Sequence, residues 1–336
     1  MRVAVVGAGA IGTLIGHGLC NGGHDVTLLD LSGRVAQIRA AAKLQVISED
    51  GYETNSKPAL VTTNYSEAGI VDVVILATKS QDLPEAAKGV MRLINRDSVI
   101  VTVQNGIPWW YLYNLQSEFG GQRIHCLDPD RILEKTIPLS QVIGCVAYPA
   151  AIMESDGRVR HVEGRRFPVG ELDGATTDRV EKVSSLFEDG GFKSRIIDDI
   201  RSEVWLKALG ALSINPVSAL TRATMVDICT FSCTRDLIRK MMEEAMQVAE
   251  AFGASFRHTI ENRIEGARAV GAHKTSMLQD VECGRPIELD AVMLSVIELA
   301  SMAGISTPII QSIYSCTALV NENLIKNDAE RVSKAS

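Results

Sequence analysis

The glycines near the start of the chain have the spacing of a nucleotide-binding turn. They form a G-x-G-x-x-G motif made up of Gly7, Ala8, Gly9, Ala10, Ile11 and Gly12. In such a motif the first glycine allows a tight turn, the second lets backbone approach a pyrophosphate, and the third lets a helix pack closely on a strand. The N-terminus of that helix offers free N–H groups and a positive dipole end to the phosphates. Asp30, eighteen residues after Gly12, could accept hydrogen bonds from a ribose diol.

Lys207 is the second residue whose surroundings suggest chemistry. It lies in an otherwise apolar stretch, and Asn215 follows eight residues later. On a helix the two side chains would lie about 80° apart and therefore near one face. The ammonium is either exposed, since lysine side chains extend readily to solvent, or buried and functional. In the second case it could stabilise and protonate an oxygen on which negative charge develops.

Two more polar groups occur in the second half of the chain. Ser276 lies in the polar segment His273–Asp280, which is also the composition of an ordinary solvated loop. Glu288 and Asp290 open an apolar stretch, a position where acidic residues commonly cap helices. The sequence contains neither a nucleophile-elbow serine motif nor an H-E-x-x-H motif, and we predict no metal site.

Apolar runs and turns predict the elements that position the glycine motif. A strand at Val3–Val6, a helix at Ala10–Leu19 and a strand at Asp25–Leu29 would place the turn and Asp30 at one end of a parallel sheet. Without a ligand, the same turn would simply join a strand to a helix in an α/β domain.

Two further buried strands end in polar residues. Val71–Ala77 is followed by Thr78-Lys79-Ser80, and Ser98–Val103 is followed by Gln104-Asn105-Gly106. Open α/β sheets bind their ligands at the carboxyl ends of the strands. The other elements predicted in this half are helices at Val35–Ala42, Leu83–Ile94 and Asp178–Phe187, and strands at Leu44–Ser48, Ala59–Thr63, Val142–Ala147, Val159–Val162, Phe167–Gly170 and Ser194–Ile197. Turns at 155–157 and 163–164 predict antiparallel hairpins that finish the sheet.

From about Asp198 the pattern changes from strands to long helices. The predicted helices are Ile200–Ser213, Arg235–Phe252, Ile260–Val270 and Glu288–Met302. We therefore predict an α/β protein with two domains: an N-terminal Rossmann-type dinucleotide-binding domain at 1–197 and an all-helical substrate and catalytic domain at 198–336. The active site is expected in the cleft between them.

Motifs along both halves make the chain resemble the ketopantoate reductases (2-dehydropantoate 2-reductases). The motifs are GAGAIG at Gly7–Gly12, ATKS at Ala77–Ser80, QNG at Gln104–Gly106, EVWLK at Glu203–Lys207, NPVSALT at Asn215–Thr221, TSMLQD at Thr275–Asp280 and IELD at Ile287–Asp290. The resemblance implies that a 2-oxo acid is reduced to the 2-hydroxy acid by hydride transfer from a nicotinamide cofactor.

The resemblance also implies roles for individual residues. Lys207 matches the general acid toward the forming alkoxide, and Glu288 matches a glutamate near the substrate hydroxyl and the cofactor. The remaining matches are the substrate-binding Asn215 and Ser276, Asn105 beside the nicotinamide, Lys79 at the border of the site and Ala150 along the cofactor.

Three positions depart from the family pattern. Ala211 and Met225 stand where the family usually carries amide side chains, so the substrate is expected to be bulkier or more apolar than ketopantoate. At Asp30-Leu31 the family often has a basic residue, in keeping with its preference for NADPH. Asp30 instead favours NAD(H), because an acid repels a 2′-phosphate, although Arg34 lies close enough to complicate this. NADP(H) remains the family expectation.

Two other functions are compatible with this sequence. One is a catabolic NAD-dependent 2-hydroxy acid dehydrogenase that runs in the oxidising direction. The other is a dinucleotide-binding sensor without chemistry, which the loss of amides at Ala211 and Met225 favours and the retention of Lys207 and Glu288 disfavours.

Composition limits the partners and the compartment. With 336 residues and a net charge of −7, the chain should bind neither nucleic acid nor an anionic membrane. The uncharged stretch Leu299–Asn321 contains polar residues and is predicted to form two buried helices with a turn at Gly304–Pro308. Seven scattered cysteines and no evident secretory signal suit packed, reduced thiols in the cytoplasm. The apolar face of Met241–Phe252 could build a homodimer or fill the core.

Overall fold

The computed structural model describes residues 1–30 and 33–335. Leu31, which forms part of the predicted Asp30-Leu31 cofactor signature, lies outside the described residues. Contacts between Cα atoms divide the chain into two compact units. Unit 1 comprises Met1–Gln104 and Asp128–Ile200, and unit 2 comprises Asn105–Leu127 and the residues from Arg201 onward.

Unit 1 is built on a seven-stranded sheet in the order β11-β8-β7-β6-β1-β2-β5. Its strands are β1 (Arg2–Val6), β2 (Asp25–Leu29), β5 (Leu60–Thr62), β6 (Val73–Leu76), β7 (Val99–Thr102), β8 (Val142–Cys145) and β11 (Val169–Glu171). All neighbours pair parallel except β11, which pairs antiparallel with β8. The order reverses between β1 and β6, the place where doubly wound sheets bind dinucleotides. The predicted Rossmann-type architecture is confirmed.

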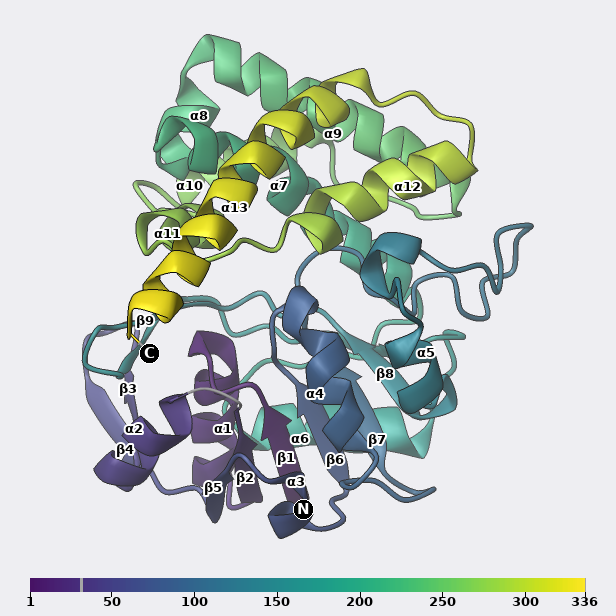
Figure 1. The fold of residues 1–336 in the computed structure, drawn as a ribbon. Helices are drawn as coiled ribbons and strands as arrows, with labels where there is room; N and C mark the ends of the chain where they lie inside the picture. The colour runs from purple at the N-terminus through teal and green to yellow at the C-terminus, as the bar shows by residue number, and fades with distance from the viewer. Residues whose placement is uncertain (31–32, 336) are drawn as a thin grey trace. The chain divides into compact units, whose positions relative to one another are not determined.

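Helices cover both faces of this sheet. They include α1 (Ala10–Asn21), α2 (Arg34–Ala41), α3 (Tyr65–Ala68), α4 (Leu83–Val90), α5 (Ile132–Thr136) and α6 (Asp178–Asp189), with 3₁₀ turns η1 (Ser80–Asp82) and η3 (Leu139–Gln141). Val5 belongs to the core cluster that also contains residues of α1 and α6, and Phe167 stacks on Phe187 of α6 at 4.8 Å. Val6, on the other face, is buried as well, and Figure 1 shows α4 in front of the strands. Burial on both faces explains why these strands read as continuous apolar runs.

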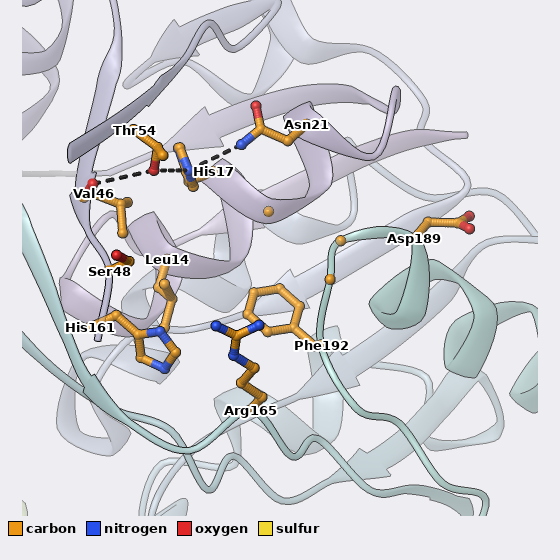
Figure 2. Close-up of a pocket in the computed structure, with 13 residues that line it drawn as sticks. Leu14, His17, Asn21, Val46, Ser48, Thr54, His161, Arg165, Asp189 and Phe192 are labelled. Atoms are coloured by element: carbon orange, nitrogen blue, oxygen red, sulfur yellow. Dashed lines mark hydrogen bonds between the residues drawn. The ribbon is translucent and has the colours of Figure 1, made fainter. Parts of the chain in front are cut away.

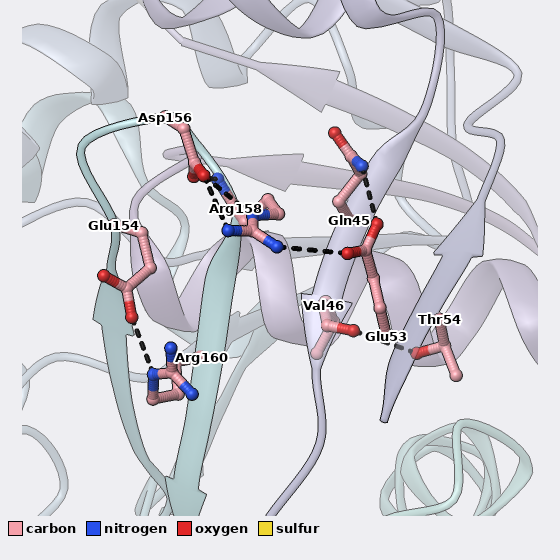
Figure 3. Close-up of polar contacts among 8 residues, drawn as sticks. All are labelled: Gln45, Val46, Glu53, Thr54, Glu154, Asp156, Arg158 and Arg160. Carbon is pink, nitrogen blue, oxygen red and sulfur yellow. Dashed lines mark hydrogen bonds and ion pairs between the residues drawn. The ribbon is translucent and has the colours of Figure 1, made fainter. Parts of the chain in front are cut away.

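A second, four-stranded sheet lies in unit 1, in the order β4-β3-β10-β9. Its strands are β3 (Leu44–Ile47), β4 (Glu53–Ser56), β9 (Ala150–Met153) and β10 (Val159–Glu163). The predicted hairpin at 155–157 joins β9 to β10, but the prediction that it finishes the main sheet was wrong, because β10 pairs with β3. Figure 3 shows Arg158, just before β10, between two carboxylates: Asp156 of the same turn at 2.8 Å and Glu53 of β4 at 3.1 Å. Such exposed pairs contribute about 1 kcal/mol at most.

The predicted edge strand at Ser194–Ile197 also differs from the structure. This segment contains one isolated bridge, Ile196 with Val169, rather than a strand, and the preceding residue Lys193 forms a second bridge with Arg166. The hairpin predicted at 163–164 connects β10 of one sheet to β11 of the other and does not pair them.

Unit 2 is helical, as predicted. Its helices are α7 (Ile200–Thr221), α8 (Met225–Thr230), α9 (Ser232–Ala251), α10 (Ile260–Ala269), α11 (Ser276–Glu282), α12 (Ser295–Met302) and α13 (Pro308–Ala335), with a 3₁₀ turn η2 (His125–Leu127) and a π-helical turn η4 (Asp290–Leu294). Helix α7 runs eight residues beyond its predicted end at Ser213 and contains Pro216. Val217 and Ala219 beyond the proline are buried, so packing outweighs the lost backbone hydrogen bond.

The segment Asn105–Leu127 belongs with unit 2, whereas the predicted bounds assign it to the first domain. The indole N–H of Trp205 donates to the Tyr111 hydroxyl at 2.6 Å, and both side chains are fully buried. Arg201 donates to the Tyr111 carbonyl at 2.8 Å. These aromatic and hydrogen-bonded contacts join residues about ninety positions apart, so the sequence carries no local sign of them.

Two further expectations concern the membrane and the cysteines. None of the described helices is long and apolar enough to cross a membrane. All seven cysteines are free thiols: Cys145 and Cys229 are buried, while Cys233, Cys283 and Cys316 are exposed and so are not the packed thiols expected.

Candidate active site

Each glycine of the N-terminal motif has a distinct steric environment. Gly7 has φ +102°, and a Cβ there would lie 2.6 Å from the backbone N of Thr78 at the end of β6. A Cβ at Gly12 would lie 1.8 Å from the carbonyl oxygen of Gly7. A Cβ at Gly9 would meet nothing within 4 Å, and Gly9 is the N-cap of α1 without a side-chain cap. The first and third glycines are thus needed by the fold, while the second leaves open backbone at a helix N-terminus, as a bound pyrophosphate requires.

Asp30 is held against this glycine turn. Its Oδ2 accepts the backbone N–H of Ala8 at 2.8 Å, and Arg34 Nε donates to the carbonyl of the same residue at 3.2 Å. Burial lowers the pKa of Arg34, and the charge of Asp30 opposes that shift. Both peptide groups of Ala8 are therefore fixed by side chains that follow β2, which places a carboxylate and a guanidinium beside the turn.

The carboxyl ends of β6 and β7 carry two buried polar atoms that have no hydrogen-bond partner among the described residues. They are Thr78 Oγ1 and Gln104 Oε1. The amide nitrogen of Gln104 donates to the Leu76 carbonyl at 2.8 Å, so the side chain is held in one orientation and its oxygen remains available to a ligand. Unpaired buried polar atoms are costly, and a polar ligand at this edge would satisfy them. The open Gly9 backbone and these two atoms together fit a dinucleotide.

Lys79 lies next to these groups, in the turn after β6. Burial raises the pKa of Asp82, an effect that the charge of Lys79 opposes and the charge of Asp30 reinforces. The three charged residues therefore influence one another at the edge of the sheet. Ala150 is the first residue of β9 in the smaller sheet, whose strand lies beside α1.

Unit 2 brings together three of the predicted residues, which lie far apart in the sequence. Lys207 Nζ on α7 donates to Asn105 Oδ1 at 2.6 Å. Asn105 Nδ2 in turn donates to Glu288 Oε2 at 3.5 Å, a long hydrogen bond. All three side chains are half-buried. The amide of Asn105 therefore lies between an ammonium and a carboxylate and orients both.

Gly106 explains how Asn105 reaches this position. Gly106 has φ +78°, and a Cβ there would lie 2.0 Å from the carbonyl oxygen of Ala291. The next residue, Ile107, donates its N–H to that same oxygen at 2.8 Å. Ala291 belongs to the π-helical turn η4, just after Glu288, and such turns are frequent at functional sites. One backbone contact thus positions Asn105 and Glu288 together.

The other predicted substrate residues are not hydrogen bonded to this group. Asn215 is half-buried on α7, and Ser276 is the exposed first residue of α11. Among the residues that the structure describes, neither side chain bonds to Lys207, Asn105 or Glu288. Sequence reasoning also left Thr78 and Gln104 out of the site, although their position at strand ends was a usable signal.

A separate cavity of about 290 Å³ lies in unit 1, away from the predicted residues. Figure 2 shows His17, Asn21 and Thr54 together on one side of it. The two ring nitrogens of His17 lie 2.9 to 3.0 Å from polar atoms of Ser56, Asn21 and Thr54, and burial lowers its pKa to about 4. His17 is therefore a neutral, hydrogen-bonded core histidine. Within residues 1–30 and 33–335, no three His, Cys, Asp or Glu side chains converge as metal ligands would.

Both halves of the chain match one family. Residues 3–174 match the family described as "Ketopantoate reductase PanE/ApbA", and residues 199–321 match "Ketopantoate reductase PanE/ApbA C terminal".

Individual proteins are similar over nearly the whole chain. A 2-dehydropantoate 2-reductase of Mesorhizobium japonicum is 39% identical over 94% of this chain and 96% of its own. A crystal structure from Ralstonia solanacearum MolK2, provisionally named a ketopantoate reductase, has a TM-score of 0.90 and 31% identity over 96% of this chain and 98% of that one. A D-mandelate dehydrogenase, solved with NADH and anilino(oxo)acetate, shares the fold with a TM-score of 0.82 at 21% identity over 96% of this chain and 99% of that one.

Proposed function

Because the chain belongs to the ketopantoate reductase family, we propose that it reduces ketopantoate, or a related branched 2-oxo acid, to the 2-hydroxy acid. The observation that carries this proposal is the hydrogen-bonded group Lys207–Asn105–Glu288. A cation that can also donate a proton is what a carbonyl needs as it becomes an alkoxide.

Unit 1 supplies the residues for the cofactor. The Gly9 backbone at the start of α1 would hold the pyrophosphate, and Thr78 and Gln104 offer polar atoms at the sheet edge. The nicotinamide, when bound, supplies the hydride. We propose NAD(H) as the preferred form, because the carboxylate of Asp30 beside the glycine turn would repel a 2′-phosphate.

In unit 2 each residue has a separate task. Lys207 Nζ would stabilise negative charge on the substrate oxygen and then donate a proton to it. Asn105 accepts a hydrogen bond from the Lys207 ammonium and holds that group in one place, which lowers the entropic cost of orienting the general acid. Glu288, linked through Asn105, would accept a hydrogen bond from the hydroxyl of the product or of the cofactor.

The test is a panel of 2-oxo and 2-hydroxy acids assayed with NAD(H) and NADP(H) in both directions. We expect reduction of branched 2-oxo acids, and Lys207→Ala should lower kcat by roughly 100-fold or more while cofactor affinity, measured by fluorescence titration, is retained. Lys274→Ala is the matched control, since Lys274 pairs with Glu282 at the surface.

Two results would contradict the proposal. If no 2-oxo acid is reduced with either cofactor, the reaction is wrong. If Lys207→Ala turns over like the wild type, the general-acid role is wrong. Faster oxidation than reduction, with a preference for NAD, would support the catabolic dehydrogenase instead.

A further inference from the structure

One stripe of α7 is accessible, and it contains Lys207. Ala208, Leu209, Leu212 and Ser213 of this helix are buried, whereas Lys207, Gly210, Ala211 and Asn215 are partly exposed. Positions three, four and eight after the lysine lie on the same side of a helix. The two residues nearest to Lys207 on this stripe carry no side chain or a single methyl group, so the helix leaves space there.

Arg263 occupies part of that space. It comes from α10, and a Cβ placed on Gly210 would lie 3.3 Å from its Nη2. A side chain longer than alanine at 210 would therefore displace the guanidinium. Because residues three apart on a helix are neighbours, this guanidinium lies against the turn of α7 that follows Lys207.

The two cations suit the two oxygen-bearing groups of one substrate. A 2-oxo acid carries its carboxylate on the carbon next to the ketone. If Lys207 faces the ketone oxygen, the carboxylate on the adjacent carbon needs a second donor nearby. Gly210, beside which the Arg263 guanidinium lies, is about one helical turn, or roughly 5 Å, from Lys207 along α7. Arginine is well suited to this, since its planar fork forms paired hydrogen bonds with a carboxylate.

We propose that Arg263 binds the substrate carboxylate and that Gly210, which has no side chain, leaves the space in which the guanidinium lies. The inference rests on the proposed function, because it names the group that recognises the acid of a 2-oxo acid. An arginine at this place would also bind a charged substrate although Ala211, which replaces an amide of the family, offers no hydrogen bond.

The test compares a 2-oxo acid with its methyl ester in wild type, Arg263→Gln and Arg263→Lys. The ester keeps the ketone but has no carboxylate charge. For the acid, Arg263→Gln should raise KM by roughly 10- to 100-fold with a smaller change in kcat, and Arg263→Lys by less. For the ester, KM should stay within about twofold, since its recognition does not use the guanidinium.

Matched controls separate binding from folding. Arg268→Gln removes an arginine of the same helix that pairs with Glu265 at 2.7 Å, and it should leave both KM values unchanged. Gly210→Leu should raise the KM of the acid as Arg263→Gln does. Gly266→Leu should not, because nothing lies within 4 Å of a Cβ there.

The outcomes distinguish the two levels of the hypothesis. If the wild type reduces no 2-oxo acid, the proposed function fails and this inference fails with it. If the wild type reduces the acid, but Arg263→Gln and Arg263→Lys change the KM of acid and ester by the same factor or not at all, the function stands and Arg263 has only a structural role.

Discussion

Replacing Gly106 by alanine tests whether the backbone contact with Ala291 holds the proposed catalytic group of Lys207, Asn105 and Glu288 together. The new Cβ would lie 2.0 Å from the Ala291 carbonyl oxygen and 2.4 Å from its carbon. Both are backbone atoms, so no side chain can rotate away to make room. Relief therefore requires Asn105–Ile107 to move relative to η4.

The cost can be divided into parts. A non-glycine residue at φ +78° costs about 1 kcal/mol. Moving Asn105–Ile107 away from η4 weakens the hydrogen bond from the Ile107 N–H to the Ala291 carbonyl, which is worth about another 1 kcal/mol. Overpacking adds roughly 1–3 kcal/mol. We expect Gly106→Ala to lower the free energy of unfolding by about 3–5 kcal/mol. The shift of Asn105 should also lower kcat.

Gly121→Ala is the control, because it shares the backbone conformation without the contact. Gly121 has φ +77°, and nothing lies within 4 Å of a Cβ there. It should cost about 1 kcal/mol and leave kcat unchanged. Urea denaturation followed by tryptophan fluorescence gives the free energy of unfolding of each variant, and a steady-state assay gives kcat. If the two variants lose the same free energy of unfolding within about 0.5 kcal/mol, the close approach of the Ala291 carbonyl is not the reason for a glycine at position 106, and the steric explanation is refuted.

Three other perturbations test separate parts of the structure. Burial lowers the pKa of His17 from 6.5 to about 4, so unfolding takes up a proton below pH 6.5. The free energy of unfolding should therefore fall by at most about 1.4 kcal/mol per pH unit down to pH 4. His17→Gln should reduce this slope in urea titrations at pH 7 and pH 5. Asp30→Ala should raise the KM for NADH and lower that for NADPH in steady-state assays, and an unchanged ratio would exclude Asp30 as the determinant. Thr275→Ala removes the cap that accepts the Leu278 N–H and should cost about 1 kcal/mol in thermal unfolding.

The strands and helices around the glycine motif could be predicted because their signals are local. β1, α1 and β2 each follow from a run of apolar residues, and the turn between β1 and α1 follows from its glycines. The polar strand β4 was not predicted, because three of its four residues are exposed and it gains its order by pairing with β3.

The smaller sheet shows a different limit. Its hairpin was predicted correctly, but the choice of sheet depends on β3, which lies more than a hundred residues earlier. Hydrophobic alternation indicates which face of a strand is buried and does not identify its partner. The membership of Asn105–Leu127 in unit 2 depends in the same way on Tyr111 meeting Trp205.

The candidate site also contains residues with local sequence signals and residues that only long-range contacts bring together. Gly7 and Gly12 are constrained by neighbours within the same strand–turn–helix unit or at the adjacent strand, so motif spacing alone identifies them. Lys207, Asn105 and Glu288 each stand out by their local context, but only the family resemblance groups them. Lys207 lies 102 positions and Glu288 lies 183 positions after Asn105, and no spacing relates residues so far apart.

Glycines in unit 2 show why a sequence motif misses part of such a site. Gly106 admits a backbone oxygen from η4, and Gly210 admits a guanidinium from α10. A glycine within a helix costs about 0.5–1 kcal/mol relative to alanine, so Gly210 in the middle of α7 is unfavourable unless something uses the space. What uses it is a side chain fifty-three residues away, and no pattern around Gly210 could identify that side chain. Unexplained glycines beside a lysine of this kind are therefore the positions at which a structure adds most to the sequence.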